Sequence, residues 1–351
     1  MGDRDITAAA FRALPKVLLH EHLDGGLRPA TLFELCRSRR LALPASDPAA
    51  LAEWLRAQAD SGSLERYLRG FELTVAAMAT PEACERVAFE AAEDARLDGC
   101  VLAEFRMAPL LLEPHGLDGD TVVEALVHGL ARSALPAGLI VCAMRHQAPT
   151  ETRRAALLAA RHAGRGVVGF DLAGAERGHP PTVHATAFRI AAEAGLGLTC
   201  HAGEADGAGR VFEAARLGAT RIGHGIHLMA GASSALVAEQ VSAARAADLH
   251  FEVCPSSNVH TGAVADLSRH PIRAMLEAGL SVSCSTDNRL MSGVTLSSEL
   301  AALHAAAGLG WTTLVQTMRH AAERSFLPPP LRSAALAAID RGVGLPRTPH
   351  R

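Results

Sequence analysis

The chain has 351 residues, a formal net charge of −3 at pH 7 and an isoelectric point near 6.6. Because it has no surplus of basic residues, we expect neither nucleic acid nor a membrane surface among its partners. The seven cysteines are odd in number, contain no C-x-x-C pair and follow no secretory signal pattern, which favours reduced thiols in a cytoplasmic protein.

Eight short apolar runs alternate with stretches of helical pattern along the chain. The runs are nearly continuous in apolar residues, as parallel strands covered on both faces should be. The alternation predicts a (β/α)8 barrel of the TIM type. An open doubly wound sheet is the alternative, but no G-x-G-x-x-G follows a strand to support its dinucleotide-binding version. The predicted strands cover 16–23, 100–107, 138–145, 166–173, 195–202, 220–225, 249–255 and 280–287.

The connection between the first two predicted strands is much longer than a typical βα loop. It covers residues 24–99 and contains helical stretches such as "RPATLFELCRSRRL" and "LERYLRGFELTVAAMA". Insertions at the carboxyl ends of barrel strands usually cover the active site. We therefore expect a single barrel domain over residues 1–351, with a helical lid inserted over 24–99 after the first strand.

Polar residues stand where the predicted strands end. In "LLHEHLDGG", His20 and His22 are two residues apart, so both rings point to one face of a strand, where a metal could be held. The carboxyl ends of all barrel strands meet on one face, so the other polar ends should lie near them. These other residues are Asp171, His201, Glu204, His224 and Asp287.

Three histidines and one carboxylate form a zinc site that leaves room for water. Bound zinc lowers the pKa of that water to about 7, which supplies the nucleophile of a hydrolase. Glu204, three residues after His201, is placed to move protons beside the metal, and His224 could orient the water and take its proton. Each motif alone has another explanation, since "HAGE" could be a capped turn and Asp287 a helix cap. Together, at successive strand ends, they favour the metal site.

The chain resembles the adenosine deaminase family, zinc-dependent purine nucleoside deaminases of the amidohydrolase barrels. The matching motifs run in family order over almost the whole chain: "PKVLLHEHLDGGLRPATL", "EFRMAP", "MRHQ", "DLAGAE", "HAGE", "RIGHGIH", "HFEVCPSSN", "STDN" and "SFLP". The resemblance implies one zinc ion per chain. Its ligands would be His20, His22, His201 and Asp287. It also implies that Glu204 protonates purine N1 while hydroxide adds at C6, and that His224 positions and deprotonates the water.

The resemblance also implies contacts with a nucleoside. Gly174 would offer its backbone N–H to purine N3, and Asp24 would bind the ribose 5′-hydroxyl. Tyr67 and Phe71, four residues apart in "LERYLRGFEL", would share a helix face and form an aromatic wall of the pocket; an ordinary contact between helix and barrel is the alternative. Asn288 stands where the family usually has a second aspartate. Its amide can donate to purine N7 but cannot share a proton with it.

The activity implied is hydrolytic deamination of adenosine and 2′-deoxyadenosine to inosine and 2′-deoxyinosine, with release of ammonia, in purine salvage. Deaminases of adenine, aminodeoxyfutalosine, AMP or a modified adenosine share the chemistry and remain alternatives. Asp24 disfavours adenine and aminodeoxyfutalosine, while the acidic charge and single lysine disfavour AMP. An inactive nucleoside-binding relative is the non-enzymatic alternative, which the presence of Glu204 and every metal ligand disfavours. The sequence leaves the oligomeric state open.

Overall fold

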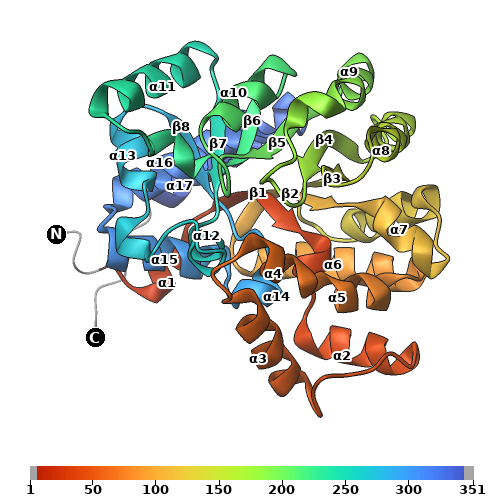
Figure 1. The fold of residues 1–351 in the computed structure, drawn as a ribbon. Helices are drawn as coiled ribbons and strands as arrows, with labels where there is room; N and C mark the ends of the chain where they lie inside the picture. The colour runs from red at the N-terminus through yellow and green to blue at the C-terminus, as the bar shows by residue number, and fades with distance from the viewer. Residues whose placement is uncertain (1–5, 344–351) are drawn as a thin grey trace, which may run out of the picture.

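The strands form one parallel sheet that curves into a barrel (Figure 1). The computed structural model describes residues 6–343, except for the side chains at positions 65, 66, 69 and 343. The strands follow one another around the sheet in chain order, so the predicted (β/α)8 barrel is confirmed and the open doubly wound sheet is not observed. They are β1 Lys16–His22, β2 Cys100–Met107, β3 Ala137–Met144, β4 Val167–Ala173, β5 Gly197–Ala202, β6 Arg221–His224, β7 His250–Val253 and β8 Ser281–Cys284.

The barrel closes between β1 and the segment that follows β8. The backbone N–H of Asp287 donates to the carbonyl of His20 at 2.9 Å, and that of His22 donates to the carbonyl of Asp287 at 2.8 Å. Strand β8 ends at Cys284, so the predicted strand was too long at this end. This closure brings Asp287 directly beside the two histidines of β1.

Buried ion pairs link the strands across the barrel interior. Arg106 pairs with Asp171 and Glu252, and Arg221 pairs with Glu252 and Glu104. All of these side chains are at most 1% exposed. A buried charge is costly unless it is paired, and here each guanidinium contacts two carboxylates.

Helices cover the outside of the barrel (Figure 1). Several begin at a side chain that caps the first turn, as Thr80, Asp118 and Thr295 do by accepting a hydrogen bond from the N–H three residues on. The α-helices are α1 Ala8–Ala13, α2 Pro29–Ser38, α3 Pro48–Ala59, α4 Leu64–Arg69, α5 Phe71–Met78, α6 Pro81–Leu97, α7 Gly119–Ala131, α8 Pro149–Arg161, α9 Ala185–Glu193, α10 Gly209–Arg216, α11 Ser234–Ala246, α12 Pro255–His260, α13 Ile272–Glu277, α14 Arg289–Ser292, α15 Leu296–Ala307, α16 Trp311–Arg324 and α17 Pro329–Val343.

The connection from β1 to β2 contains a short 3-10 turn, Leu23–Gly25, and five α-helices. The last of these, α6, packs against α7 and β2 as an ordinary barrel helix. Helices α2 to α5 are therefore additional to the strand–helix repeat. In Figure 1, α2 and α3 extend beyond the barrel, and α4 packs against α3. Among the described residues, no helix combines the length and the apolar character needed to span a membrane.

Candidate active site

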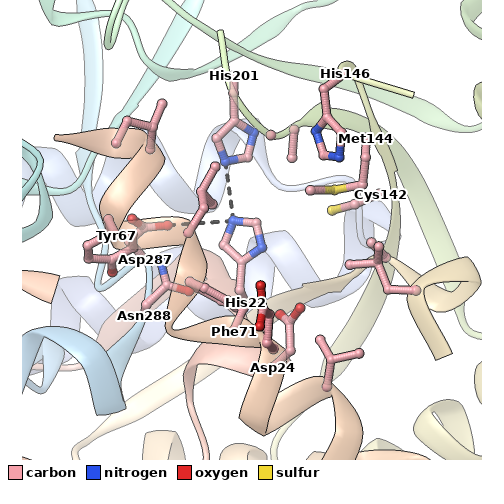
Figure 2. A pocket seen from close by; sticks show the side chains of 18 of the residues that line it. His22, Asp24, Tyr67, Phe71, Cys142, Met144, His146, His201, Asp287 and Asn288 are labelled. Carbon is pink, nitrogen blue, oxygen red and sulfur yellow. Dashed lines mark hydrogen bonds and ion pairs between the residues drawn. The ribbon is translucent and has the colours of Figure 1, made fainter. Parts of the chain in front are cut away.

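A cavity of about 550 Å³ lies at the carboxyl ends of the strands (Figure 2). Figure 2 shows His22, His201 and Asp287 converging on one side of it, with His146 and Asp24 on other sides. Of the site residues predicted from the sequence, those that line the cavity are His22, Asp24, Tyr67, Phe71, Gly174, His201, Glu204, His224, Asp287 and Asn288. His20 does not line it and is fully buried.

Four histidines and one aspartate cluster at the end of this cavity. Ligand atoms of His20, His201, His224 and Asp287 all lie within 4.8 Å of one another. His22 joins them, since its Nε2 atom lies 3.2 Å from His201 Nε2 and 3.5 Å from Asp287 Oδ1. The structure thus brings the four predicted ligands together, with His224 among them.

Two of these histidines contact a buried carboxylate through their Nδ1 atoms. Nδ1 of His20 lies 3.0 Å from Glu252 Oε2, and Nδ1 of His201 lies 3.0 Å from Asp171 Oδ2. Arg106 donates to both carboxylates, at 2.7 Å to Glu252 and 2.9 Å to Asp171. Burial opposes ionisation of Asp171, but His201 and Arg106 hold its pKa well below the usual range. An ionised carboxylate only accepts, so each Nδ1 carries a proton and each Nε2 keeps a lone pair.

The two Nε2 lone pairs and the Asp287 carboxylate therefore lie together without a ring proton of His20 or His201 between them. His20 Nε2 is buried and hydrogen-bonds to no described residue, and Asp287 Oδ1 lies 3.2 Å from it. Burial would raise the pKa of Asp287, but the neighbouring histidines hold it well below its usual range, and Ser257 donates to Oδ2 at 2.6 Å. Two acceptors this close repel each other unless a cation lies between them. Imidazole nitrogens and a carboxylate are ligands that fit a divalent transition metal such as zinc.

Glu204 and His224 face each other beside the cluster. His224 Nε2 lies 3.6 Å from Glu204 Oε2, and Thr261 Oγ1 donates to Glu204 Oε1 at 3.2 Å. Burial, followed by the charges of Asp287 and Glu176, raises the pKa of Glu204 well above its usual value. A raised pKa favours the protonated carboxyl, which is the form that a general acid needs.

The turn that carries Glu204 is held by a buried glutamate from the loop after β4. The carboxylate of Glu176 accepts the backbone N–H groups of Gly203, Glu204, Ala205 and Asp206, at 2.5 to 3.1 Å. Glu176 is only 2% exposed. Four converging N–H groups form an anion-binding concavity, and here the protein fills it with its own carboxylate.

Two predicted nucleoside contacts lie elsewhere along the cavity. Asp24 is 4% exposed, its Oδ1 atom hydrogen-bonds to no described residue, and burial raises its pKa to about 7. Gly174 has a φ of +89°, and a Cβ atom there would come within 3.0 Å of His146 Nδ1. Only glycine fits this conformation and space easily, which leaves the backbone at Gly174 accessible from the cavity.

The lid aromatics do not share one helix. Tyr67 lies on α4 and Phe71 begins α5, because the helix is interrupted at Gly70, so the expectation of a common helix face is wrong. Both rings nevertheless line the cavity, with centroids 6.0 Å apart.

Asn288 lies opposite Gly25, where a Cβ atom would be only 1.9 Å from Asn288 Oδ1, so the position of Asn288 requires a glycine there.

The sequence did not identify the residues that hold the site together. Glu252, Arg106, Glu176 and Asn258 all lie within motifs that resemble the family, but without an assigned role. A signal was available for Glu252 and Arg106, because a charged residue inside an apolar strand of a barrel needs a partner from another strand. Glu176 lies in a loop and Asn258 in the short helix α12, neither of which is an apolar strand, so the sequence gives no such signal for them.

Comparisons with known proteins agree with this geometry. The adenosine deaminase family model matches residues 15–341. Adenosine deaminase of Mycobacterium tuberculosis is 43% identical over 353 residues, covering 96% of this chain and 95% of that protein. Adenosine deaminase of Mycobacteroides abscessus is 44% identical over 340 residues, covering 92% and 93%. The crystal structure of adenine deaminase from Arthrobacter aurescens superposes with a TM-score of 0.87 at 27% identity, covering 95% of this chain and all of that one. The chain belongs to the adenosine deaminase family.

Proposed function

We propose that this protein is a zinc-dependent adenosine deaminase, which converts adenosine and 2′-deoxyadenosine to the corresponding inosine nucleosides and ammonia. The observation that carries the proposal is the buried histidine–aspartate cluster, in which His20 Nε2 has no hydrogen-bond partner among the described residues. It lies beside the buried acid Glu204, in a chain 43% identical to named adenosine deaminases. Its partner would be a small purine nucleoside, and its place the cytoplasm, where reduced thiols persist.

Four residues would hold one zinc ion: His20, His22, His201 and Asp287. The carboxylates behind His20 and His201 leave their Nε2 atoms free to coordinate. His224 is left out of this set because its Nε2 atom faces Glu204. A bound zinc ion would supply Lewis acidity, which lowers the pKa of water to about 7.

The remaining polar residues would bind the nucleoside and move its protons. Attack on C6 interrupts the resonance of the purine, so a proton delivered to N1 in step with attack lowers the barrier. Glu204 is suited to this step because its raised pKa keeps the proton available. Gly174 would donate its backbone N–H to N3, and Asn288 would donate its amide N–H to N7.

The ribose end would be recognised by Asp24. Its buried carboxyl has an unpartnered oxygen, and a substrate hydroxyl would satisfy it. Tyr67 and Phe71 would form the apolar wall of the pocket, within a helical lid formed by α2 to α5 of a single barrel domain. An adenine deaminase is the second candidate, because the Arthrobacter aurescens structure carries that name. Free adenine would leave Asp24 unsatisfied, which favours a nucleoside.

The proposal is tested by ammonia release from adenosine, 2′-deoxyadenosine, adenine, aminodeoxyfutalosine and AMP with the zinc-loaded protein. We expect the highest kcat/KM on the first two, and at least about 100-fold less on adenine, as a site built to bind a hydroxyl rejects an analogue that lacks it. Preference for adenine would move the function to the second candidate. Lack of turnover on every compound would contradict both.

A further inference from the structure

A chain of hydrogen bonds leads from the backbone at the start of α13 to the ring of His224. Ile272 N–H donates to His270 Nδ1 at 3.2 Å. His270 Nε2 lies 3.2 Å from Asn258 Oδ1, and Asn258 Nδ2 lies 3.0 Å from His224 Nδ1. His270, Asn258 and His224 are 4%, 0% and 1% exposed, so their protein partners determine where the ring protons lie.

The donor and the acceptor of each hydrogen bond follow from the backbone N–H of Ile272, where the chain of bonds begins. A peptide N–H can only donate, so His270 Nδ1 accepts and carries no proton. A neutral imidazole has one ring proton, which therefore lies on His270 Nε2 and is donated to Asn258 Oδ1. Burial lowers the pKa of His270 to about 4, in agreement with a neutral ring.

This assignment also orients the amide of Asn258. If its oxygen and nitrogen were exchanged, its NH2 group would face the N–H of His270, donor against donor. The NH2 group is therefore turned toward His224, whose Nδ1 accepts. The ring proton of neutral His224 must then lie on Nε2, the atom that faces Glu204 at 3.6 Å.

We propose that Asn258 and His270 are positioning residues that hold His224 with its proton on Nε2, so that His224 donates a hydrogen bond to the attacking oxygen and does not remove a proton from it. This rests on the proposed function and changes one expected role, since the family resemblance implies that His224 deprotonates the water. The overall adenosine reaction is unchanged: a bound zinc ion would lower the pKa of the water to about 7, so the oxygen would already have lost its proton to solvent before it attacks.

His224 also differs from two of the proposed metal ligands in the group that contacts its Nδ1 atom. His20 and His201 donate through Nδ1 to carboxylates, so their Nε2 lone pairs are free. His224 accepts through Nδ1 from an amide, so its Nε2 carries a proton and has no lone pair for a metal. The partner of Nδ1 thus decides the role of each ring: a carboxylate leaves His20 and His201 free to bind a metal, and an amide makes His224 a hydrogen-bond donor.

The direct test is the tautomer of His224 in the zinc-loaded protein labelled with ¹⁵N-histidine. Long-range ¹H–¹⁵N spectra distinguish a proton on Nε2 from one on Nδ1, and the signals of His224 are those lost in His224→Gln. We expect the Nε2–H form in the wild-type protein. The Nδ1–H form would overturn the inference, whatever the activity on adenosine.

Asn258→Asp is the matched perturbation, because it keeps the shape and the acceptor for His270 but replaces the NH2 donor by an oxygen. The ring of His224 should then carry its proton on Nδ1, and kcat on adenosine should fall about 100-fold, the cost of losing one aligned donor. An unchanged tautomer or an unchanged kcat would overturn the inference. Inactivity of the wild-type protein would instead contradict the proposed function, and the spectra would still decide the tautomer.

Two variants of His270 distinguish the loss of its hydrogen bond from a general loss of structure. His270→Gln keeps a side-chain N–H that can reach Asn258, whereas His270→Phe keeps the ring shape without a donor. We expect the glutamine variant to retain more of the kcat and of the Nε2–H signal than the phenylalanine variant. Equal behaviour of the two variants would contradict a role for this donor. His162→Gln, at a buried histidine paired with Asp120 outside the site, serves as the control and should leave both readouts unchanged.

Discussion

Replacing Glu176 by glutamine should loosen the turn that carries Glu204. The carboxylate accepts one backbone N–H through Oε1, from Gly203, and three through Oε2. Glutamine has only one side-chain oxygen, so at best it accepts the three N–H groups that Oε2 accepts in the wild type. Its NH2 group then faces the N–H of Gly203, donor against donor. A buried unsatisfied N–H costs about 1–3 kcal/mol. Each of the three remaining hydrogen bonds contributes about 1 kcal/mol less, because its acceptor is no longer charged. Relief from burying a charge offsets part of this, so we expect a loss of about 3 kcal/mol in the free energy of unfolding.

The assay is urea unfolding at 25 °C of the wild type, Glu176→Gln and the control Glu213→Gln. Glu213 lies on the next helix, α10, and pairs only with Arg210 among the described residues, so its change should be within about 0.5 kcal/mol. Because the turn also places Glu204, kcat of Glu176→Gln on adenosine should fall at least about 10-fold. An unfolding free energy within about 0.5 kcal/mol of the wild type, with normal kcat, would refute this account of the turn.

Two further variants test separate parts of the site, and a third tests a buried carboxyl group on α15. Glu204→Gln should retain zinc, measured by metal analysis, but lose at least about 100-fold in kcat because no proton reaches N1; near-normal turnover would exclude the acid role. Asp24→Ala should raise KM for adenosine about 10-fold or more, yet affect 5′-deoxyadenosine little, whereas equal losses on both would remove the ribose contact. Glu299, 1% exposed, has its pKa raised by burial from 4.5 to about 7. The folded state therefore holds a proton that the unfolded chain releases between these values, so the free energy of unfolding falls as pH rises through this window, by up to about 3 kcal/mol. Glu299→Gln should remove this fall and be more stable relative to the wild type at pH 8 than at pH 5 in urea unfolding; parallel pH dependences would contradict it.

The barrel was predictable because its strands are buried on both faces and therefore appear as apolar runs. The positions of His20, His201 and Asp287 followed from the same pattern, since the carboxyl ends of parallel strands meet. The end of β8 was misplaced because Asp287 continues the ladder to β1 only as an isolated bridge, which apolar pattern does not reveal.

The contacts behind the site were not predictable from one sequence. Arg106 and Glu252 are 146 residues apart, and their pairing depends on the register of strands around the barrel. The break between Tyr67 and Phe71 depends on how α4 and α5 pack, because a glycine in a helical pattern is often tolerated. The orientation of Asn258 depends on a backbone N–H that contacts His270, and no sequence motif encodes that contact.

The central claim is tested most directly by kcat/KM on adenosine for the purified protein before removal of metal, after removal with a chelator, and after addition of one equivalent of zinc. We expect activity to be lost with the metal and to recover at one zinc per chain, while the His20→Ala variant binds less zinc and recovers little activity. Full activity of the metal-free protein, or no activity on adenosine at one zinc per chain, would contradict it.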